Sequence, residues 1–141
     1  MTPEEKAYIA GIIDGEGTVT LTRGHVNELP SPRVSVANND LRLLKWIREK
    51  AGCGCITTRS KVQPQHGVNY VLNVCDNPAL KLLAEVKEYL IIKKPHAELL
   101  SSRYKAVTPR NGRYTEELLA GKMALVAEIR QLNRHVTDSG P

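Results

Sequence analysis

Glu16 is the residue whose surroundings in this sequence point most directly to chemistry. It follows an apolar, helix-like stretch, and the flanking Gly15 and Gly17 favour a break in that helix. Small residues at Ala7, Gly11 and Gly15 recur every four positions, so they share one helix face on which a second helix can pack closely. One carboxylate cannot build a multi-metal site, whereas two Glu16 side chains brought together across a helix pair can.

Divalent metals held by carboxylates supply what hydrolysis of a phosphodiester needs: a nucleophilic water, stabilisation of the developing charge and a neutralised leaving oxygen. Mg²⁺ fits this composition best because it takes few protein oxygens and keeps several waters, and another divalent cation such as Mn²⁺ is a possible substitute. Glu16 is therefore of the residue type that a hydrolytic metal site uses, and the spacing of the small residues leaves room for a second helix beside it.

Polar residues alternate with apolar ones over residues 17–23, 33–37, 55–61 and 68–75, which predicts four strands with one polar face. A curved pair of strands fits the DNA major groove, where side chains of one face can bond to base edges. The candidates for such contacts are Thr20, Thr22, Arg33, Ser35, Thr57, Arg59, Lys61, Asn69 and Asn73. Arg59 suits a guanine and Lys61 a phosphate. The alternative is an ordinary solvated sheet face.

The nine residues from Ile9 to Gly17, IAGIIDGEG, resemble the motif of the LAGLIDADG homing endonucleases, and the first six match outright or by an aliphatic exchange. The resemblance implies that this helix pairs with a copy of itself at the centre of the molecule. It also implies that Glu16 is a divalent-metal ligand, with the backbone carbonyl of Gly15 beside it. The dimer-interface residues that we expect are Ala7, Ala10, Gly11 and Asp14. The alternative is a buried apolar helix that shows the pattern by chance.

Three further residues match family positions with roles in catalysis. By this resemblance, Asn38 orders the water network, Arg42 faces the active site, and Lys93 neutralises developing charge. The two cations have a physical rationale as electrostatic stabilisers. The alternatives are ordinary surface charge for Arg42 and Lys93, and a helix cap for Asn38.

The predicted elements alternate in an order typical of α+β proteins. They are a helix at 3–14, strands at 17–23 and 33–37, a helix at 41–51, strands at 55–61 and 68–75, and helices beginning at 76, 95 and 115, the last ending near 135. The resemblance implies an αββαββα core with a saddle-shaped antiparallel sheet and additional C-terminal helices. We expect a single domain over 1–141, with its core at about 2–97 and a helical extension at about 98–135. This extension can brace the fold, contact DNA or extend the dimer.

Composition sets broad limits on partners and location. The 141 residues carry a formal net charge of +5 and a pI near 9.2, which favours a polyanionic partner. No apolar run approaches the roughly 18 residues that span a bilayer, and no secretory segment follows Met1. We expect no membrane partner and an intracellular location, in the cytoplasm or nucleoid, or in an organelle matrix if an organelle encodes the chain.

Three cysteines, Cys53, Cys55 and Cys75, leave an odd thiol and do not indicate a disulfide framework. We interpret them as reduced structural thiols. A zinc site that also uses His66 is the alternative, which the Cys-x-Cys spacing disfavours.

The leading hypothesis from the resemblance is a site-specific homing endonuclease that cuts double-stranded DNA with Mg²⁺ as a homodimer. Its two-fold symmetry implies a long pseudo-palindromic target, and the family leaves short 3′ overhangs. Two alternatives stay open: an intron RNA maturase, with RNA as a partner, and a catalytically inert DNA-binding regulator. Glu16, with Arg42 and Lys93, favours cleavage, because a pure binder needs no metal carboxylate. The sequence alone leaves the target, and the choice between an intron and an intein as host, undecided.

Overall fold

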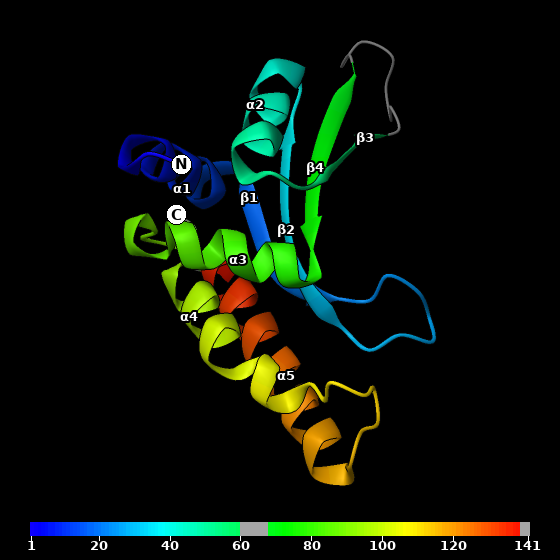
Figure 1. Ribbon diagram of the computed structural model, residues 1–141. Helices are drawn as coiled ribbons and strands as arrows, with labels where there is room; N and C mark the ends of the chain where they lie inside the picture. Colours follow the sequence, from blue (N-terminus) through cyan, green and yellow to red (C-terminus); the bar gives the residue numbers. More distant parts are fainter. Residues whose placement is uncertain (60–67, 139–141) are drawn as a thin grey trace.

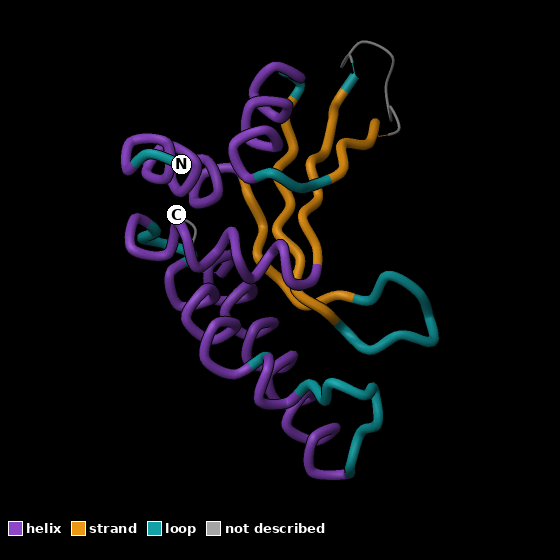
Figure 2. The backbone as a smooth tube through the Cα atoms, in the orientation of Figure 1, coloured by secondary structure: helices purple, strands orange, loops and turns teal. Residues whose placement is uncertain are grey.

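A computed structural model describes residues 1–59 and 68–138 of the chain. These residues form a four-stranded antiparallel sheet whose apolar face is covered by helices (Figures 1 and 2). The elements in chain order are α1 (Pro3–Glu16), β1 (Gly17–Thr22), β2 (Ser31–Asn38), α2 (Leu41–Ala51), β3 (Cys55–Arg59), β4 (Asn69–Cys75), α3 (Asp76–Val86), η2 (Lys87–Tyr89), α4 (Lys94–Arg103), η3 (Lys105–Val107) and α5 (Glu116–Asp138). The α+β class predicted from the sequence is confirmed.

The strands lie in the order β1-β2-β4-β3, so β2 and β4 are central. Val34 of β2 faces Val19 of β1 on one side and Val74 of β4 on the other, and all three are buried. Paired residues of an antiparallel sheet point to the same face. This row therefore marks the face on which α2 and α3 lie in Figure 1.

The first helix begins at a capping box. The backbone N–H of Thr2 donates to the Glu5 carboxylate at 2.8 Å, and the Glu5 N–H donates to the Thr2 hydroxyl at 3.1 Å. The helix continues two residues beyond the predicted end at 14 and stops at Glu16. A Cβ on Gly17 would lie 2.8 Å from Cα of Ile13, so only glycine permits this close exit from the helix.

The second strand starts at Ser31, earlier than the sequence pattern predicts, and includes Pro32. Proline has no N–H for a sheet hydrogen bond and is confined to positions with an open side. Pro32 meets that condition because its partner is Leu21 on β1, whereas pairing of β2 with β4 begins only at Arg33.

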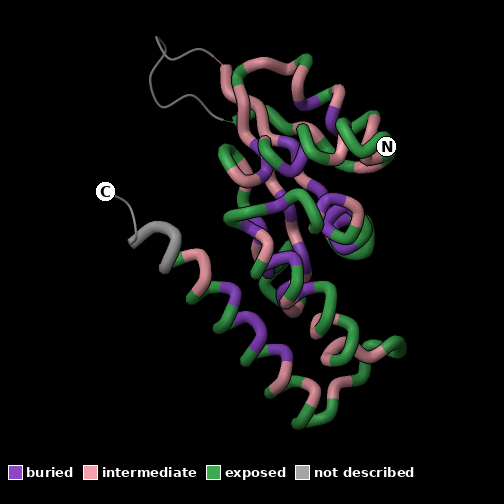
Figure 3. The backbone as a smooth tube through the Cα atoms, turned by 90° about the vertical axis from the view of Figure 1, so that its left-hand side faces the viewer, coloured by how far each residue is buried: buried purple, intermediate pink, exposed green. Residues whose placement is uncertain are grey.

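The C-terminal helix α5 belongs to the same hydrophobic core as the sheet. Its Leu125, Val126 and Ile129 are buried together with Ile9 and Ile13 of α1. Figure 3 shows buried and exposed stretches alternating along α5, as expected for a helix with one side in the core. No helix among the described residues is long and apolar enough to span a bilayer.

Candidate functional site

The carboxylate of Glu16 stands exposed at the last residue of α1. Its Oε2 accepts a hydrogen bond of 2.8 Å from Nδ2 of Asn38, the last residue of β2. Carbonyls in the last turn of a helix, including that of Gly15, have no intrahelical donor, and the helix dipole is negative there. This end of α1 is consequently suited to a cation.

A chain of hydrogen bonds extends from Glu16 to the start of α2. Oδ1 of Asn38 accepts the backbone N–H of Asp40 at 2.7 Å. Asp40 accepts the backbone N–H of Arg42 at 3.0 Å, so Asp40 is the helix cap and the alternative that assigned this role to Asn38 is wrong. The guanidinium of Arg42 pairs with Asp40 through two hydrogen bonds of 3.1 and 2.8 Å. This pairing lowers the pKa of Asp40.

Asp14 anchors the loop that carries Lys93. Its Oδ2 accepts the N–H of Ile91 at 2.8 Å and its Oδ1 accepts the N–H of Lys93 at 2.9 Å. Lys93 is only 8% exposed and directly precedes α4. The structure therefore ties the backbone of Lys93 to α1 within two residues of Glu16.

The open face of α1 consists of the small residues predicted from their spacing. Ala7, Gly11 and Gly15 are all exposed, and a Cβ placed on either glycine would meet no other atom within 4 Å. Beside this face, the loop anchored by Asp14 exposes the apolar side chains of Ile91 (83%) and Ile92 (48%). Neither isoleucine was expected at an interface, because the local sequence does not show whether an apolar residue is exposed.

Two of the four expected interface residues have partners inside the single chain. Ala10 is fully buried in the core, so it offers no surface to a second copy and its placement in an interface is wrong. It follows Ile9 on the side of α1 that packs against the rest of the chain. The carboxylate of Asp14 is engaged by Ile91 and Lys93, as described above. Ala7 and Gly11 remain open.

The candidate DNA-contacting residues that the structure describes share the face of the sheet opposite its buried face. The register pairs Thr20 with Arg33, Ser35 with Asn73, and Arg59 with Asn69. Thr22 and Thr57 follow the same alternation, and Lys61 lies outside the described residues.

Two of these polar residues are linked directly. The Ser35 hydroxyl donates to Oδ1 of Asn73 at 2.6 Å. On the same face, Nε of Arg33 is buried without a hydrogen-bond partner among the described residues. Buried donors are almost always paired, so this one is suited to an acceptor from outside the chain.

A polar pair that was not expected from the sequence adjoins Lys93, and its histidine is buried. His96 on α4 is 1% exposed, and its Nε2 lies 2.9 Å from Oδ1 of Asn133 on α5. The amide nitrogen of Asn133 donates to the carbonyl of Val19 on β1. A lone histidine in an amphipathic helix gives no local signal of such a contact.

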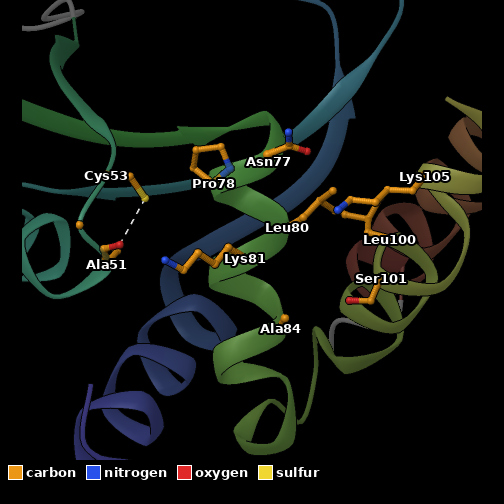
Figure 4. Close-up of a pocket in the computed structure, with 11 residues that line it drawn as sticks. Ala51, Cys53, Asn77, Pro78, Leu80, Lys81, Ala84, Leu100, Ser101 and Lys105 are labelled. Carbon is orange, nitrogen blue, oxygen red and sulfur yellow. Dashed lines mark hydrogen bonds between the residues drawn. The ribbon is translucent and has the colours of Figure 1, made fainter. Parts of the chain in front are cut away.

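A surface cavity of about 670 Å³ lies among α2, α3 and α4 (Figure 4). Lys81 stands on its α2 side and Lys105 on its α4 side, so their ammonium groups do not converge. Cys53 in its wall donates to the Ala51 carbonyl at 3.5 Å, and burial raises the pKa of this thiol. All three cysteines are free, and no group of three or more acidic, histidine or cysteine residues that could hold a metal occurs in the described part of the chain.

Several homing endonucleases have similar structures. I-CvuI in complex with its target in the presence of calcium superposes with a TM-score of 0.74 at 18% identity, over 92% of this chain and 82% of that chain. The archaeal intron-encoded I-Vdi141I complexed with DNA gives 0.72 at 20% identity, over 92% and 84%. The LAGLIDADG meganuclease I-AabMI bound to uncleaved DNA gives 0.66 at 20% identity, over 85% of this chain but 42% of that chain. Neither the protein-family models nor the curated protein sequences gave a match.

The chain therefore has the fold of the LAGLIDADG homing endonucleases. The resemblance indicated by the nine-residue motif is confirmed at the level of the fold. In this structure the motif occupies the second half of α1, the helix that ends at Glu16, and Gly17 begins β1.

Proposed function

We propose that the protein is a site-specific, divalent-metal-dependent endonuclease that cuts double-stranded DNA as a homodimer. The observation that carries the proposal is the exposed carboxylate of Glu16 at the foot of an open small-residue helix face, beside a polar sheet face. Structures with the same fold have been solved as complexes with DNA.

The residues at the end of α1 fit a hard divalent cation. Glu16 and the Gly15 carbonyl supply oxygen, the ligand type that Mg²⁺ prefers. Asn38 donates its hydrogen bond to Oε2 of the Glu16 carboxylate, and Oε1 makes no such bond among the described residues. One chain supplies a single carboxylate, so the donor set becomes adequate when a second copy brings its own Glu16. I-CvuI has been crystallised with DNA in the presence of calcium and in the presence of magnesium. We expect Mg²⁺, or another divalent cation such as Mn²⁺, to act here.

Bound divalent metal would activate a water and stabilise charge on the phosphodiester. The chain itself would orient the reacting groups. Asn38 would hold the Glu16 carboxylate through its amide N–H, while Asp40 fixes the orientation of Arg42 near the same end of the sheet. The Lys93 ammonium would stabilise the developing negative charge.

Homodimerisation is supported by the open face of α1. Ala7, Gly11 and Gly15 leave room for the backbone of a second helix, and Ile91 and Ile92 would extend the contact with apolar surface. The chain spans only 42% of I-AabMI, whereas it spans most of I-CvuI and I-Vdi141I. A chain of this length with one motif is expected to act as two copies on a long pseudo-palindromic target, leaving short 3′ overhangs.

The polar face of the sheet would read the DNA major groove. Arg59 and Arg33 are the two arginines that the structure describes on this face, and Nε of Arg33, buried without a partner among the described residues, could donate to a base or phosphate once its side chain turned outward. The net charge of +5 favours binding to the phosphate backbone, so affinity should fall steeply with salt.

The deciding experiment is cleavage of a randomised double-stranded DNA library with Mg²⁺, comparing wild type with Glu16→Gln. Cuts at one enriched pseudo-palindrome that disappear in the variant, while DNA binding persists, support the endonuclease. Selective binding without cutting by either protein would instead indicate an inert regulator. Failure to select any DNA would lead to tests with structured intron RNA and the maturase alternative.

A further inference from the structure

His96 occupies the first turn of α4, one helical turn after Lys93, and is almost fully buried. The amide nitrogen of its partner Asn133 donates to the Val19 carbonyl at 3.3 Å, so the amide oxygen faces His96 as an acceptor. The hydrogen-bond network therefore assigns a proton to Nε2 of the neutral imidazole. Its Nδ1 is then an unprotonated acceptor, buried without a partner among the described residues.

The surroundings favour the uncharged imidazole. Burial lowers the pKa of His96 below 6.5, and the positive charge of Lys93 lowers it further. The hydrogen bond with Asn133 on α5 and the negative charge of Asp14 on α1 act in the opposite direction without overcoming burial. The ring is therefore neutral at neutral pH and adds no positive charge next to Lys93.

The turn that carries Lys93 is held from two sides. From α1, Asp14 accepts the Lys93 N–H, and within α4 the Lys93 carbonyl accepts the N–H of Ala97 at 3.1 Å. On the other side, His96 joins this turn to α5 through Asn133, and Asn133 joins α5 to β1, the strand that directly follows Glu16. These two sets of hydrogen bonds, which we call the clamp, together fix the distance between the Lys93 turn and the end of α1.

We infer that His96 and Asn133 are positioning residues, which set Lys93 for phosphodiester cleavage by fixing the first turn of α4 to β1. The inference rests on the proposed function. It gives α5 a part in the reaction although none of its residues was expected in the site, and it predicts an effect on the chemical step rather than on DNA affinity.

The test compares His96→Leu and Asn133→Leu, which break the pair, with His96→Gln, which keeps a neutral N–H donor for Asn133. Ile129→Val on α5 is the matched control, because Ile129 is fully buried and has no polar group. Single-turnover cleavage with Mg²⁺ should fall about 10- to 100-fold in the two leucine variants. DNA affinity measured with Ca²⁺ should stay within about two-fold, and His96→Gln should keep most of the wild-type rate.

The pH profile gives a readout that a purely structural role would not move. Wild-type cleavage should decline at acidic pH, where the imidazole gains a proton beside Lys93 at its lowered pKa, whereas His96→Gln should lack that component of the decline. Identical pH profiles of the wild type and His96→Gln would overturn the inference. A cleavage rate of His96→Leu equal to that of Ile129→Val, at matched Tm, would overturn it as well.

Amide hydrogen exchange separates this inference from the proposed function. Exchange at the Ile91 and Lys93 amides should rise at least about tenfold in His96→Leu and Asn133→Leu, but not in His96→Gln or Ile129→Val. Unchanged exchange at these amides refutes the clamp, whatever the enzymatic result. A wild-type protein that cuts no DNA while this exchange pattern holds refutes the nuclease proposal and a catalytic purpose for the clamp, but leaves its structural part established.

Discussion

Two polar networks begin in the last turn of α1 and differ in their access to solvent. One starts at Glu16 and passes through Asn38 to the pair of Asp40 and Arg42, whose guanidinium side chain is 92% exposed. The other starts at Asp14 and reaches Lys93, which is 8% exposed. The exposed network can meet a metal, DNA or a second copy, whereas the bonds of Asp14 hold the backbone of the turn that carries Lys93.

The difference in burial separates activity from stability. Exposed polar pairs contribute little to the free energy of folding, because water replaces them readily. A buried group that loses its partner costs the full penalty of desolvation. Substitutions in the exposed network should therefore change the reaction and spare the fold, while those in the buried network should change both.

The largest effect is expected from Glu16→Gln. Cleavage should fall by on the order of 10³ or more, because a charged oxygen ligand is lost. Its stability should stay the same or rise by about 0.5 kcal/mol, because a negative charge at a helix C-terminus opposes the helix dipole. Single-turnover kinetics and thermal unfolding measure the two quantities, with Glu4→Gln at the other end of α1 as the control. A large loss of stability in Glu16→Gln would contradict the expectation that the exposed network affects activity and not the fold.

A leucine at Gly11 tests whether the open face of α1 is reserved for a partner. Within one chain nothing lies within 4 Å of the added Cβ, and replacing a helical glycine should stabilise the monomer by roughly 0.8 kcal/mol. Dimerisation and cleavage should both be lost. Sedimentation velocity of Gly11→Leu, compared with Ala124→Leu on the exposed side of α5, checks the result. Dimers of wild-type strength would show that another surface is used.

In the network that reaches Lys93, Asp14→Asn should lower the free energy of unfolding by about 1 kcal/mol, because the bond from Ile91 is exposed and the bond from Lys93 is part-buried. An amide offers one oxygen to two backbone donors, so the N–H of either Ile91 or Lys93 loses its acceptor. Urea unfolding measures the change. Asp40→Asn is the control in the exposed network and should be nearly neutral, because asparagine caps helices as well as aspartate does. An equal loss of unfolding free energy in Asp14→Asn and Asp40→Asn would contradict the expected difference between the two networks.

On the sheet, Arg59→Ala should weaken target binding by about 1.5 kcal/mol and relax the preference at one base pair. Thr58→Ala is the control, because Thr58 pairs with Tyr70 and belongs to the opposite face. Fluorescence anisotropy with single-base target variants gives both quantities. If Thr58→Ala weakened binding as much as Arg59→Ala, the polar face would not be the one that reads DNA.

The smallest effect is a dependence of stability on pH. Burial lowers the pKa of His96 in the native state, so the unfolded chain takes up the proton first and stability falls as the pH drops below 6.5. His96→Gln should lack this component. Both proteins should share the later loss from Glu5, whose pKa is lowered from 4.5 to about 2 by Lys50. Calorimetry between pH 4.5 and 8 should show that the stability of the wild type falls more steeply toward low pH than that of His96→Gln. Parallel curves of stability against pH would contradict a lowered pKa of His96.

Local patterns account for much of the fold. The helices expected at 3–14 and 41–51 and the alternation along β4 each matched their element to within a few residues. The errors have physical causes that lie outside the local pattern. The helix break expected at Gly15 moved to Gly17, and β2 gained Pro32, because contacts with neighbouring backbone decide both ends.

The candidate site was accessible to sequence reasoning only in part. The face shared by Ala7, Gly11 and Gly15 follows from a spacing of four, and the motif directed attention to Glu16. The roles assigned to Asn38, Arg42 and Lys93 stay predictions. Ala10 was misplaced because helical spacing gives the faces of α1 but does not say which of them the rest of the chain covers.

By itself, the sequence determined the elements, the two faces of the sheet and the position of Glu16 at the end of a small-residue helix. These follow from periodicities of about 3.6 and 2 residues, which adjacent residues already encode. Only the tertiary structure decided that Asp14 holds the Lys93 turn and that His96 meets Asn133 of α5. Such contacts join residues far apart in the chain, so they depend on how whole helices and strands pack, which no short stretch of sequence specifies.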